Sequence, residues 1–155
     1  MQFSPDRQKA LDLLLPRYPD AEAAMLPTLR LAQEEFGFVS KDVIEFVARR
    51  LDVPVARVTA VASFYTMFDK RPVGTYHIQV CQNLSCSLMG GEHIIEHLEK
   101  KLGIKSGETT ADKRFTLTRV ECLGACGTAP VMQINDDYHE DLTAEKVDSI
   151  LAELK

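Results

Sequence analysis

The four cysteines of this chain stand in two close pairs, and they constrain its fold more than any other feature. The pairs, with four and three intervening residues, are Cys81 with Cys86 and Cys122 with Cys126. A stretch of 35 residues separates the pairs, and the sequence contains no other cysteine. Each pair follows a β-rich run that predicts a strand, at 75–80 and at 115–120. Both pairs are therefore expected in loops at strand ends.

Four thiols placed two by two on adjacent loops of one sheet suit a tetrahedral zinc ion or a two-iron cluster. The spacing leaves the metal open, because structural zinc sites accept these separations but favour C-x2-C. Glycines accompany both pairs, at Gly90, Gly91, Gly124 and Gly127, and they let backbone amides approach and point at sulfur. A cluster of two ferric ions, two sulfides and four thiolates has a charge of about −2. Such amides and a helix N-terminus near Gly90 would stabilise that charge.

Other roles for the cysteines fit the pattern less well than metal binding. As small buried hydrophobes, all four would have to lie beside glycines at strand ends by chance. A stand-alone thiol–disulfide oxidoreductase is less favoured, because neither pair has the C-x2-C spacing of redox-active dithiols. A zinc-stapled interaction module without a redox role stays open. Among the histidines, His93 and His97 are four residues apart but lack the H-E-x-x-H order, so they are interpreted as solvated surface residues.

Composition excludes several classes of protein. The 155 residues are 45% hydrophobic, which is ordinary for one globular domain or two small ones. The net charge is −5 and the basic residues are scattered, so nucleic acid is not expected as a partner. No run approaches the ~20 apolar residues of a membrane span, and no secretory signal is recognised, which predicts an intracellular chain without direct membrane insertion. Persistent disulfides are rare in that compartment, which favours metal ligation.

Hydrophobic periodicity predicts an α+β chain with two parts. Residues 1–72 form a helical domain and linker, and residues 73–155 form a second domain, with the boundary at Pro72-Val73-Gly74. The four expected helices start after Ser4, near Leu26, after Ser40 and at Pro54, and they end before Pro16, at Gly37, near Leu51 and near Tyr65. The second part is expected to contain strands at 75–80, 115–120 and 131–134, a short fourth strand, and helices at 91–102 and after Thr143.

The cysteine motifs resemble those of a known family. C-x4-C followed by the run Glu121-Cys122-Leu123-Gly124-Ala125-Cys126-Gly127-Thr128-Ala129-Pro130 resembles the thioredoxin-like [2Fe-2S] E-subunit family of NADH:quinone oxidoreductase, respiratory complex I. The resemblance extends through 61–68 and 72–76, which look like the linker region of that family, and covers nearly the whole chain. Related subunits of NAD-linked formate dehydrogenases and hydrogenases carry the same pattern. The pattern therefore leaves open which of these enzymes contains the chain.

The resemblance implies an N-terminal helical bundle followed by a thioredoxin-like [2Fe-2S] ferredoxin domain. It implies one [2Fe-2S] cluster, whose ligands are Cys81, Cys86, Cys122 and Cys126. The cluster would exchange electrons with FMN in a partner NADH-binding subunit of the F type, and FMN and NADH would lie only in that partner. Further partners would be other peripheral-arm subunits. The chain would be an oxidoreductase subunit with no catalytic residue of its own. It would be cytoplasmic, and other subunits would hold it at the periphery of the inner membrane.

No dinucleotide fingerprint or phosphate loop occurs in the sequence, so the chain is not expected to bind NADH or flavin by itself. The apolar run 61–68 is interpreted in two parts. Val61, Ala62 and Phe64 are assigned to the helical core, and Tyr65, Met67 and Phe68 are predicted to dock a partner subunit, since aromatic residues and Met are enriched at interfaces. Pro130 has either the cis bond typical of the implied fold or the trans bond that base rates favour.

Overall fold

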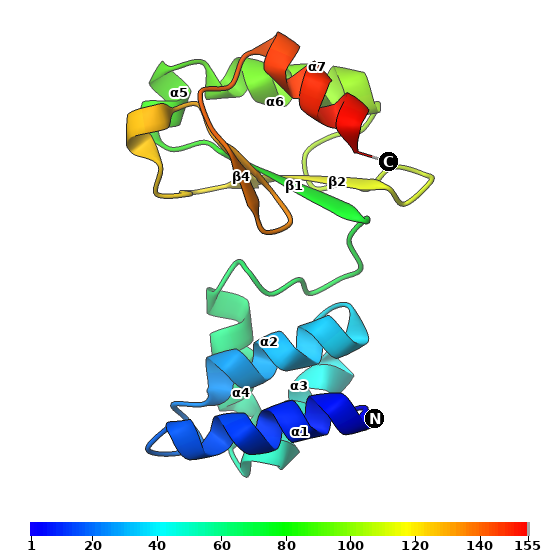
Figure 1. Cartoon of the computed structure of the whole chain (residues 1–155), viewed down its shortest axis with the longest axis vertical. Coiled ribbons are helices and arrows are strands. Elements are labelled where there is room, and N and C mark those ends of the chain that lie inside the picture. The colour runs from blue at the N-terminus through cyan, green and yellow to red at the C-terminus, as the bar shows by residue number, and fades with distance from the viewer. Residues whose placement is uncertain (155) are drawn as a thin grey trace. The chain divides into compact units, whose positions relative to one another are not determined.

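A computed structural model describes residues 1–154 of the chain, which divides into two compact units (Figure 1). The first unit spans Met1–Pro72 and the second begins at Val73. The first is helical, whereas the second combines a sheet with helices, so the predicted α+β class is confirmed. Each unit has its own hydrophobic core.

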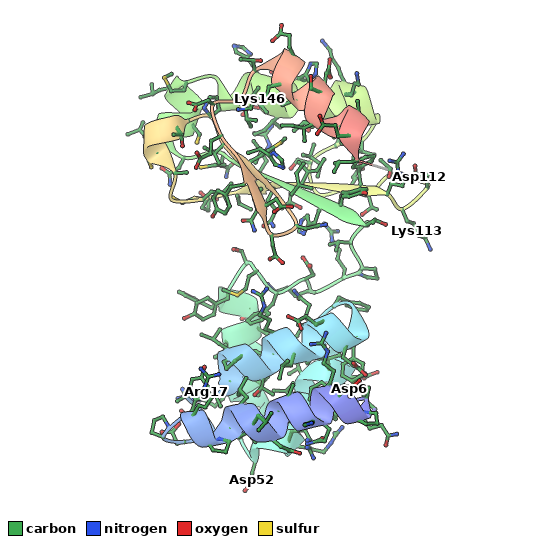
Figure 2. The ribbon with its side chains drawn as sticks, viewed as in Figure 1. Asp6, Arg17, Asp52, Asp112, Lys113 and Lys146 are labelled. Carbon is green, nitrogen blue, oxygen red and sulfur yellow. The ribbon has the colours of Figure 1, made fainter. Side chains whose placement is uncertain are left out.

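Four helices make up the first unit. They are α1 (Pro5–Leu14), followed by a 3₁₀ turn at Leu15–Arg17, then α2 (Met25–Phe36), α3 (Lys41–Leu51) and α4 (Val55–Phe64). The side chains of Ser4 and Ser40 cap α1 and α3 by accepting hydrogen bonds from the amides of Arg7 and Val43. Asp6, labelled in Figure 2, adds a negative charge to the first turn of α1, where the helix dipole favours it.

The core of the first unit is formed by the apolar faces of these helices. Its fully buried side chains include Leu11, Leu29, Val43, Val47 and Val58. Burying an aliphatic side chain of this size contributes about 1.5–3 kcal/mol. Tertiary packing of these faces therefore stabilises helices of only 10 to 12 residues that would be marginal in isolation.

The segment after α4 corrects the prediction for the run 61–68. Phe68 is only 2% exposed and belongs to the helical core, so its assignment to a docking surface is wrong. Phe64 is 78% exposed, so its assignment to the core is wrong as well, whereas Ala62 is buried as predicted. Tyr65 packs partly against the core, and Met67 is 53% exposed.

Backbone hydrogen bonds explain why Phe68 turns inward. The amide of Phe68 donates to the carbonyl of Tyr65, which closes a turn directly after α4. The next residue is then fixed on both sides, because the Asp69 amide donates to Gln33 Oε1 at 2.7 Å and its carbonyl accepts from Val39. The helical period no longer applies beyond Phe64, so periodicity could not place Phe68.

The second unit is a four-stranded sheet with helices. The elements in chain order are β1 (Tyr76–Cys81), α5 (Leu84–Leu88), α6 (Gly91–Leu102), β2 (Phe115–Val120), a 3₁₀ turn at Cys126–Thr128, β3 (Met132–Ile134), β4 (Asp137–His139) and α7 (Ala144–Glu153). The strand order is β2-β1-β3-β4. β1 and β2 are parallel and are joined through α6, while β3 is antiparallel to both β1 and β4.

Helices α6 and α7 lie on one face of this sheet (Figure 1). Ile95 and Leu98 of α6 and Val147 of α7 are fully buried in one core with Ile78 and Leu117 of the strands. The predicted ranges for α6 and β2 are confirmed without a shift, whereas β1 begins one residue later than expected.

Two local predictions for this unit are corrected. His97 is not a solvated surface residue, because it is half-buried against α7 and its Nε2 lies 2.8 Å from Asp148 Oδ1. His93 is exposed as interpreted. The peptide bond between Ala129 and Pro130 is cis, so the trans bond favoured by base rates is wrong here. None of the helices within residues 1–154 is long and apolar enough to cross a bilayer.

We predict that Thr116→Val destabilises the second unit. Thr116 is buried on β2, where its hydroxyl accepts a 2.6 Å hydrogen bond from the Gly74 amide and pairs with the Thr109 hydroxyl at 2.8 Å. Valine keeps the shape but leaves the buried amide unpaired, which costs about 1–3 kcal/mol. Urea unfolding followed by circular dichroism measures the loss. Thr75→Val at a neighbouring exposed position is the matched control, and equal midpoints for the two variants would contradict the prediction.

Candidate metal centre

The first cysteine loop leaves β1 at Cys81 and turns immediately into a short helix. The Asn83 side chain caps α5 by accepting a hydrogen bond from the Leu84 amide at 2.7 Å. Cys86 lies within α5, and both Cys81 and Cys86 are buried. The sequence pattern predicted a loop here rather than α5. Asn83, a residue type that favours N-caps, was the available cue, but five residues are too few to give a periodic pattern.

Glycines bring the next helix directly against this loop. Gly90 adopts a φ of 94° and precedes α6, which begins at Gly91. A Cβ on Gly91 would lie 2.8 Å from the carbonyl oxygen of Cys86 and 3.3 Å from that of Cys81. The first turn of α6 therefore packs on the backbone that carries both thiols. The expected helix N-terminus near Gly90 is confirmed.

The second cysteine loop follows β2 and carries the exposed residues Cys122 and Cys126. Gly124 has a φ of 75°, and its amide donates a 3.3 Å hydrogen bond to Cys122 Sγ. This is the backbone-to-sulfur contact that the glycine pattern predicted. The hydroxyl of Tyr138 on β4 donates to the carbonyl of Leu123 at 3.0 Å and braces the same loop. No pattern in the sequence marked Tyr138 for this role.

Strand pairing places the two loops side by side. Cys81, the last residue of β1, is in register with Val120, the last residue of β2. Neighbouring strands lie about 4.8 Å apart, so both chains leave the sheet at the same edge. Beyond the strands, the Gln82 amide donates to the Val120 carbonyl at 3.0 Å, and Gln82 Nε2 donates to Glu121 Oε1 at 2.9 Å.

Apolar packing then joins the loops over the buried thiols. Cys81 and Cys86 form a small cluster with buried Ala129 and Val131, against which two half-buried residues of the second loop, Leu123 and Ala125, also pack. The Cys81 amide donates to the carbonyl of Val131 at 3.1 Å. The structure thus brings Cys81 and Cys86 together beside the loop that carries the other two cysteines.

The electrostatics of the buried thiols depend on their neighbours. Burial raises the pKa of Cys86, and the hydrogen bond with Cys81 and the negative charges that Cys81 and Cys126 acquire as thiolates raise it further. A hydrogen bond from the Val131 backbone acts in the opposite direction. Several thiolates are therefore stable together only beside a cation, which deprotonates its sulfur ligands outright.

The donor set fits an iron–sulfur cluster of the two-iron type. Four thiols with glycine amides nearby match the ligands of a [2Fe-2S] cluster, in which each iron takes two protein ligands. The cysteines are arranged as two pairs on two loops. Within residues 1–154, no three Cys, His, Asp or Glu side chains are grouped as ligands of one metal ion.

Comparison with known proteins agrees with this fold. A family model for the thioredoxin-like [2Fe-2S] ferredoxin matches residues 11–155. One E subunit of NADH-quinone oxidoreductase from Rhizobium meliloti (strain 1021), numbered 2, is 50% identical over 135 residues, which are 87% of this chain and 80% of the relative. The E subunit of the same enzyme from Rickettsia felis is 50% identical over 143 residues, 90% of this chain and 86% of the relative.

A solved structure shares the fold at lower identity. A chain of an NAD⁺-reducing [NiFe]-hydrogenase in the H₂-reduced state superposes with a TM-score of 0.73 and 24% identity. The match covers 84% of this chain and 22% of the hydrogenase chain.

The fold and the site together define a helical unit followed by a thioredoxin-like domain with two cysteine loops at one edge of its sheet. The chain belongs to the thioredoxin-like [2Fe-2S] ferredoxin family, and the two relatives described above are E subunits of NADH-quinone oxidoreductase. The resemblance drawn from the cysteine motifs is confirmed.

We predict that Gly91→Ala distorts the first cysteine loop. The new Cβ would clash with the carbonyl of Cys86 at 2.8 Å, and overpacking of this kind costs about 1–3 kcal/mol. The gain in helix propensity of about 1 kcal/mol offsets only part of this cost. The temperature of thermal unfolding and the iron content after anaerobic reconstitution should both fall.

Gly127→Ala is the matched control for this variant, because a Cβ there meets nothing within 4 Å although Gly127 directly follows Cys126. It should retain the unfolding temperature and the iron content of the unaltered chain. If Gly91→Ala behaves like Gly127→Ala, the close approach of α6 to the loop does not matter for the site.

Proposed function

We propose that this chain is an electron-transfer subunit that holds one [2Fe-2S] cluster. Its ligands would be the thiolates of Cys81, Cys86, Cys122 and Cys126. The observation that carries the proposal is the register of the parallel strands, in which Cys81 pairs with Val120 and both cysteine loops leave the same edge of the sheet. In sheets with parallel strands, ligands bind outside the carboxyl ends of the strands.

The residues of this chain would bind, orient and partly shield the cluster. Packing of Ala129 and Val131 on Cys81 and Cys86 excludes water from one side. The amide of Gly124 stabilises charge on Cys122 Sγ, and hydrogen bonds to sulfur are one determinant of the reduction potential. When bound, the cluster supplies one-electron redox chemistry. Exposed Cys122 and Cys126 leave the other side open to an electron donor or acceptor.

The partner that we infer is a subunit that binds both NADH and FMN, of the F type in NADH-quinone oxidoreductase. This chain contains no dinucleotide or phosphate-loop motif, so hydride chemistry would lie in the partner, and FMN would pass single electrons to the cluster. Identity of 50% to E subunits against 24% to the hydrogenase chain favours the quinone-linked assembly. Other peripheral-arm subunits would hold the chain at the cytoplasmic side of the membrane.

We predict that the chain, reconstituted anaerobically with iron and sulfide, becomes red-brown with two irons and two sulfides per molecule. Cys126→Ala should lose most of the cluster, since three thiolates leave iron open to water, whereas Cys126→Ser should retain a weakened one through an alkoxide. Visible absorption, and electron paramagnetic resonance after reduction, measure how much cluster each variant holds.

Ser87→Ala is the control for these cysteine variants, because Ser87 is an exposed residue next to Cys86. It should bind a full cluster. A full, unshifted cluster in Cys126→Ala would remove this residue from the ligand set. A colourless protein with one stoichiometric zinc would instead identify a zinc-stapled interaction module. A colourless, metal-free protein would leave thiol–disulfide chemistry as the remaining function.

We also predict that residues 73–155 assemble the cluster without the helical unit. All four proposed ligands lie in this segment, and it has its own hydrophobic core. The segment expressed alone should show the same visible spectrum and iron content as the full chain after anaerobic reconstitution. Failure to take up iron and sulfide while the full chain does so would show that the assignment of the cluster domain to 73–155 is wrong.

A further inference from the structure

The cysteine loops carry one charged side chain besides the thiols. In the segments 82–91 and 121–130, Glu121 is the only Asp, Glu, Lys or Arg, and neither segment contains histidine. Its side chain is exposed, yet it does not extend freely into solvent. Glu121 Oε1 accepts a hydrogen bond from Gln82 Nε2 at 2.9 Å, across the gap between the two loops.

The position of this pair is fixed by the strands beneath it. Gln82 directly follows Cys81 and Glu121 directly precedes Cys122. The Gln82 amide donates to the Val120 carbonyl at 3.0 Å, so the two side chains start from hydrogen-bonded backbone. The Sγ of Cys81 lies 4.0 Å from the carbonyl oxygen of Glu121. The Glu121 carboxylate is therefore tied to the residue that follows Cys81, and Glu121 itself directly precedes Cys122.

The partner of Glu121 is neutral, which distinguishes it from Glu92 and Glu99 of the same unit. Glu92 pairs with Arg119 through two hydrogen bonds of 2.7 and 2.8 Å, and Glu99 pairs with Lys105 at 2.7 Å. A cation cancels much of the field of a carboxylate, whereas an amide only orients it. The negative charge of Glu121 thus acts on its surroundings without a compensating positive charge within the two loops.

Such a charge matters for a cluster that changes its own charge. A [2Fe-2S] cluster with four thiolates goes from about −2 to about −3 when it accepts an electron, and net charge near the cluster is one determinant of its reduction potential. Coulomb repulsion from a fixed carboxylate disfavours the reduced form. We propose that Glu121, positioned by Gln82, holds down the reduction potential of the cluster. The inference rests on the proposed function, because it requires the cluster to be present.

The test is the reduction potential of the reconstituted full-length chain, measured by anaerobic potentiometric titration with paramagnetic resonance detection. Glu121→Gln removes the charge and keeps a side chain that can still bond to Gln82. At an exposed site the equilibrium constant for reduction should rise roughly threefold to tenfold, which is ~30–60 mV for a one-electron couple. Glu121→Asp keeps the charge and should stay closer to the unaltered chain than Glu121→Gln does.

Glu153→Gln is the matched control for loss of one charge. Glu153 is the last residue of α7, and the Leu154 carbonyl next to it accepts a 2.9 Å hydrogen bond from Arg114, just before β2 begins. That end of the sheet, marked in Figure 2 by Asp112 and Lys113, is separated from the cysteine loops by the six residues of β2, ~20 Å of strand. This exceeds the Debye length of about 10 Å at 0.1 M salt, so the potential should not move.

Positioning by Gln82 is tested by a double-mutant cycle. Gln82→Ala frees the carboxylate to turn into solvent, so the potential should rise by less than in Glu121→Gln. In the Glu121→Gln background, Gln82→Ala should add almost nothing, because the two residues act as a unit. If the pair had only a structural role, these variants would change the amount of bound cluster, but the reduction potential would not depend on the charge at position 121.

Each outcome decides a different question. An absent cluster in the unaltered chain would overturn the proposed function. An intact cluster whose potential is the same in Glu121→Gln and Glu153→Gln would overturn the role of Glu121 alone. Equal shifts from Gln82→Ala in both backgrounds would show that Gln82 acts independently of Glu121. Loss of the cluster in both Glu121→Gln and Glu121→Asp would show that Glu121 is needed for assembly and does not set the potential.

Discussion

The parallel pairing of β1 and β2 is the constraint on which the candidate site depends. Six consecutive pairs run from Tyr76 with Phe115 to Cys81 with Val120, so both strands end at the same level. Because α6 connects them on one face, the chain returns to start β2 beside β1 and parallel to it. Two cysteine pairs that are 35 residues apart in sequence thus become neighbours at one edge. A slip of one residue would turn every side chain of one strand to the opposite face.

Much of this arrangement was predictable, because it depends on strong local patterns. Period-2 alternation marked the strand β1, the apolar face of Ile94, Ile95 and Leu98 marked α6, and the capping residues Ser4, Ser40 and Thr143 marked helix starts. The glycines were informative for a steric reason. Gly91 cannot accept a Cβ beside Cys86, and Gly124 needs the positive φ that points its amide at Cys122 Sγ.

The predictions that were wrong share a different cause. At those residues, contacts with residues distant in sequence overrode the local pattern. Phe68 is buried because Asp69 is fixed by Gln33 and Val39, residues at least 30 positions earlier. His97 lies on the polar side of α6 but is covered by α7, whose position no pattern in α6 reveals. The Gln82–Glu121 contact could not be predicted either, because it depends on the register of β1 against β2 rather than on either loop alone.

The site is asymmetric, and this asymmetry follows from where each loop sits. Cys81 and Cys86 are covered by Val131 and Ala129, so their thiols are desolvated and the pKa of Cys86 is raised. Cys122 and Cys126 follow the edge strand β2 and stay exposed. A cluster held between them would have a low-dielectric side that strengthens electrostatic effects and a wet side that weakens them. Glu121 lies on the exposed loop, so solvent would limit its influence, and the hydrogen bond from the neutral Gln82 side chain ties its carboxylate to the first loop.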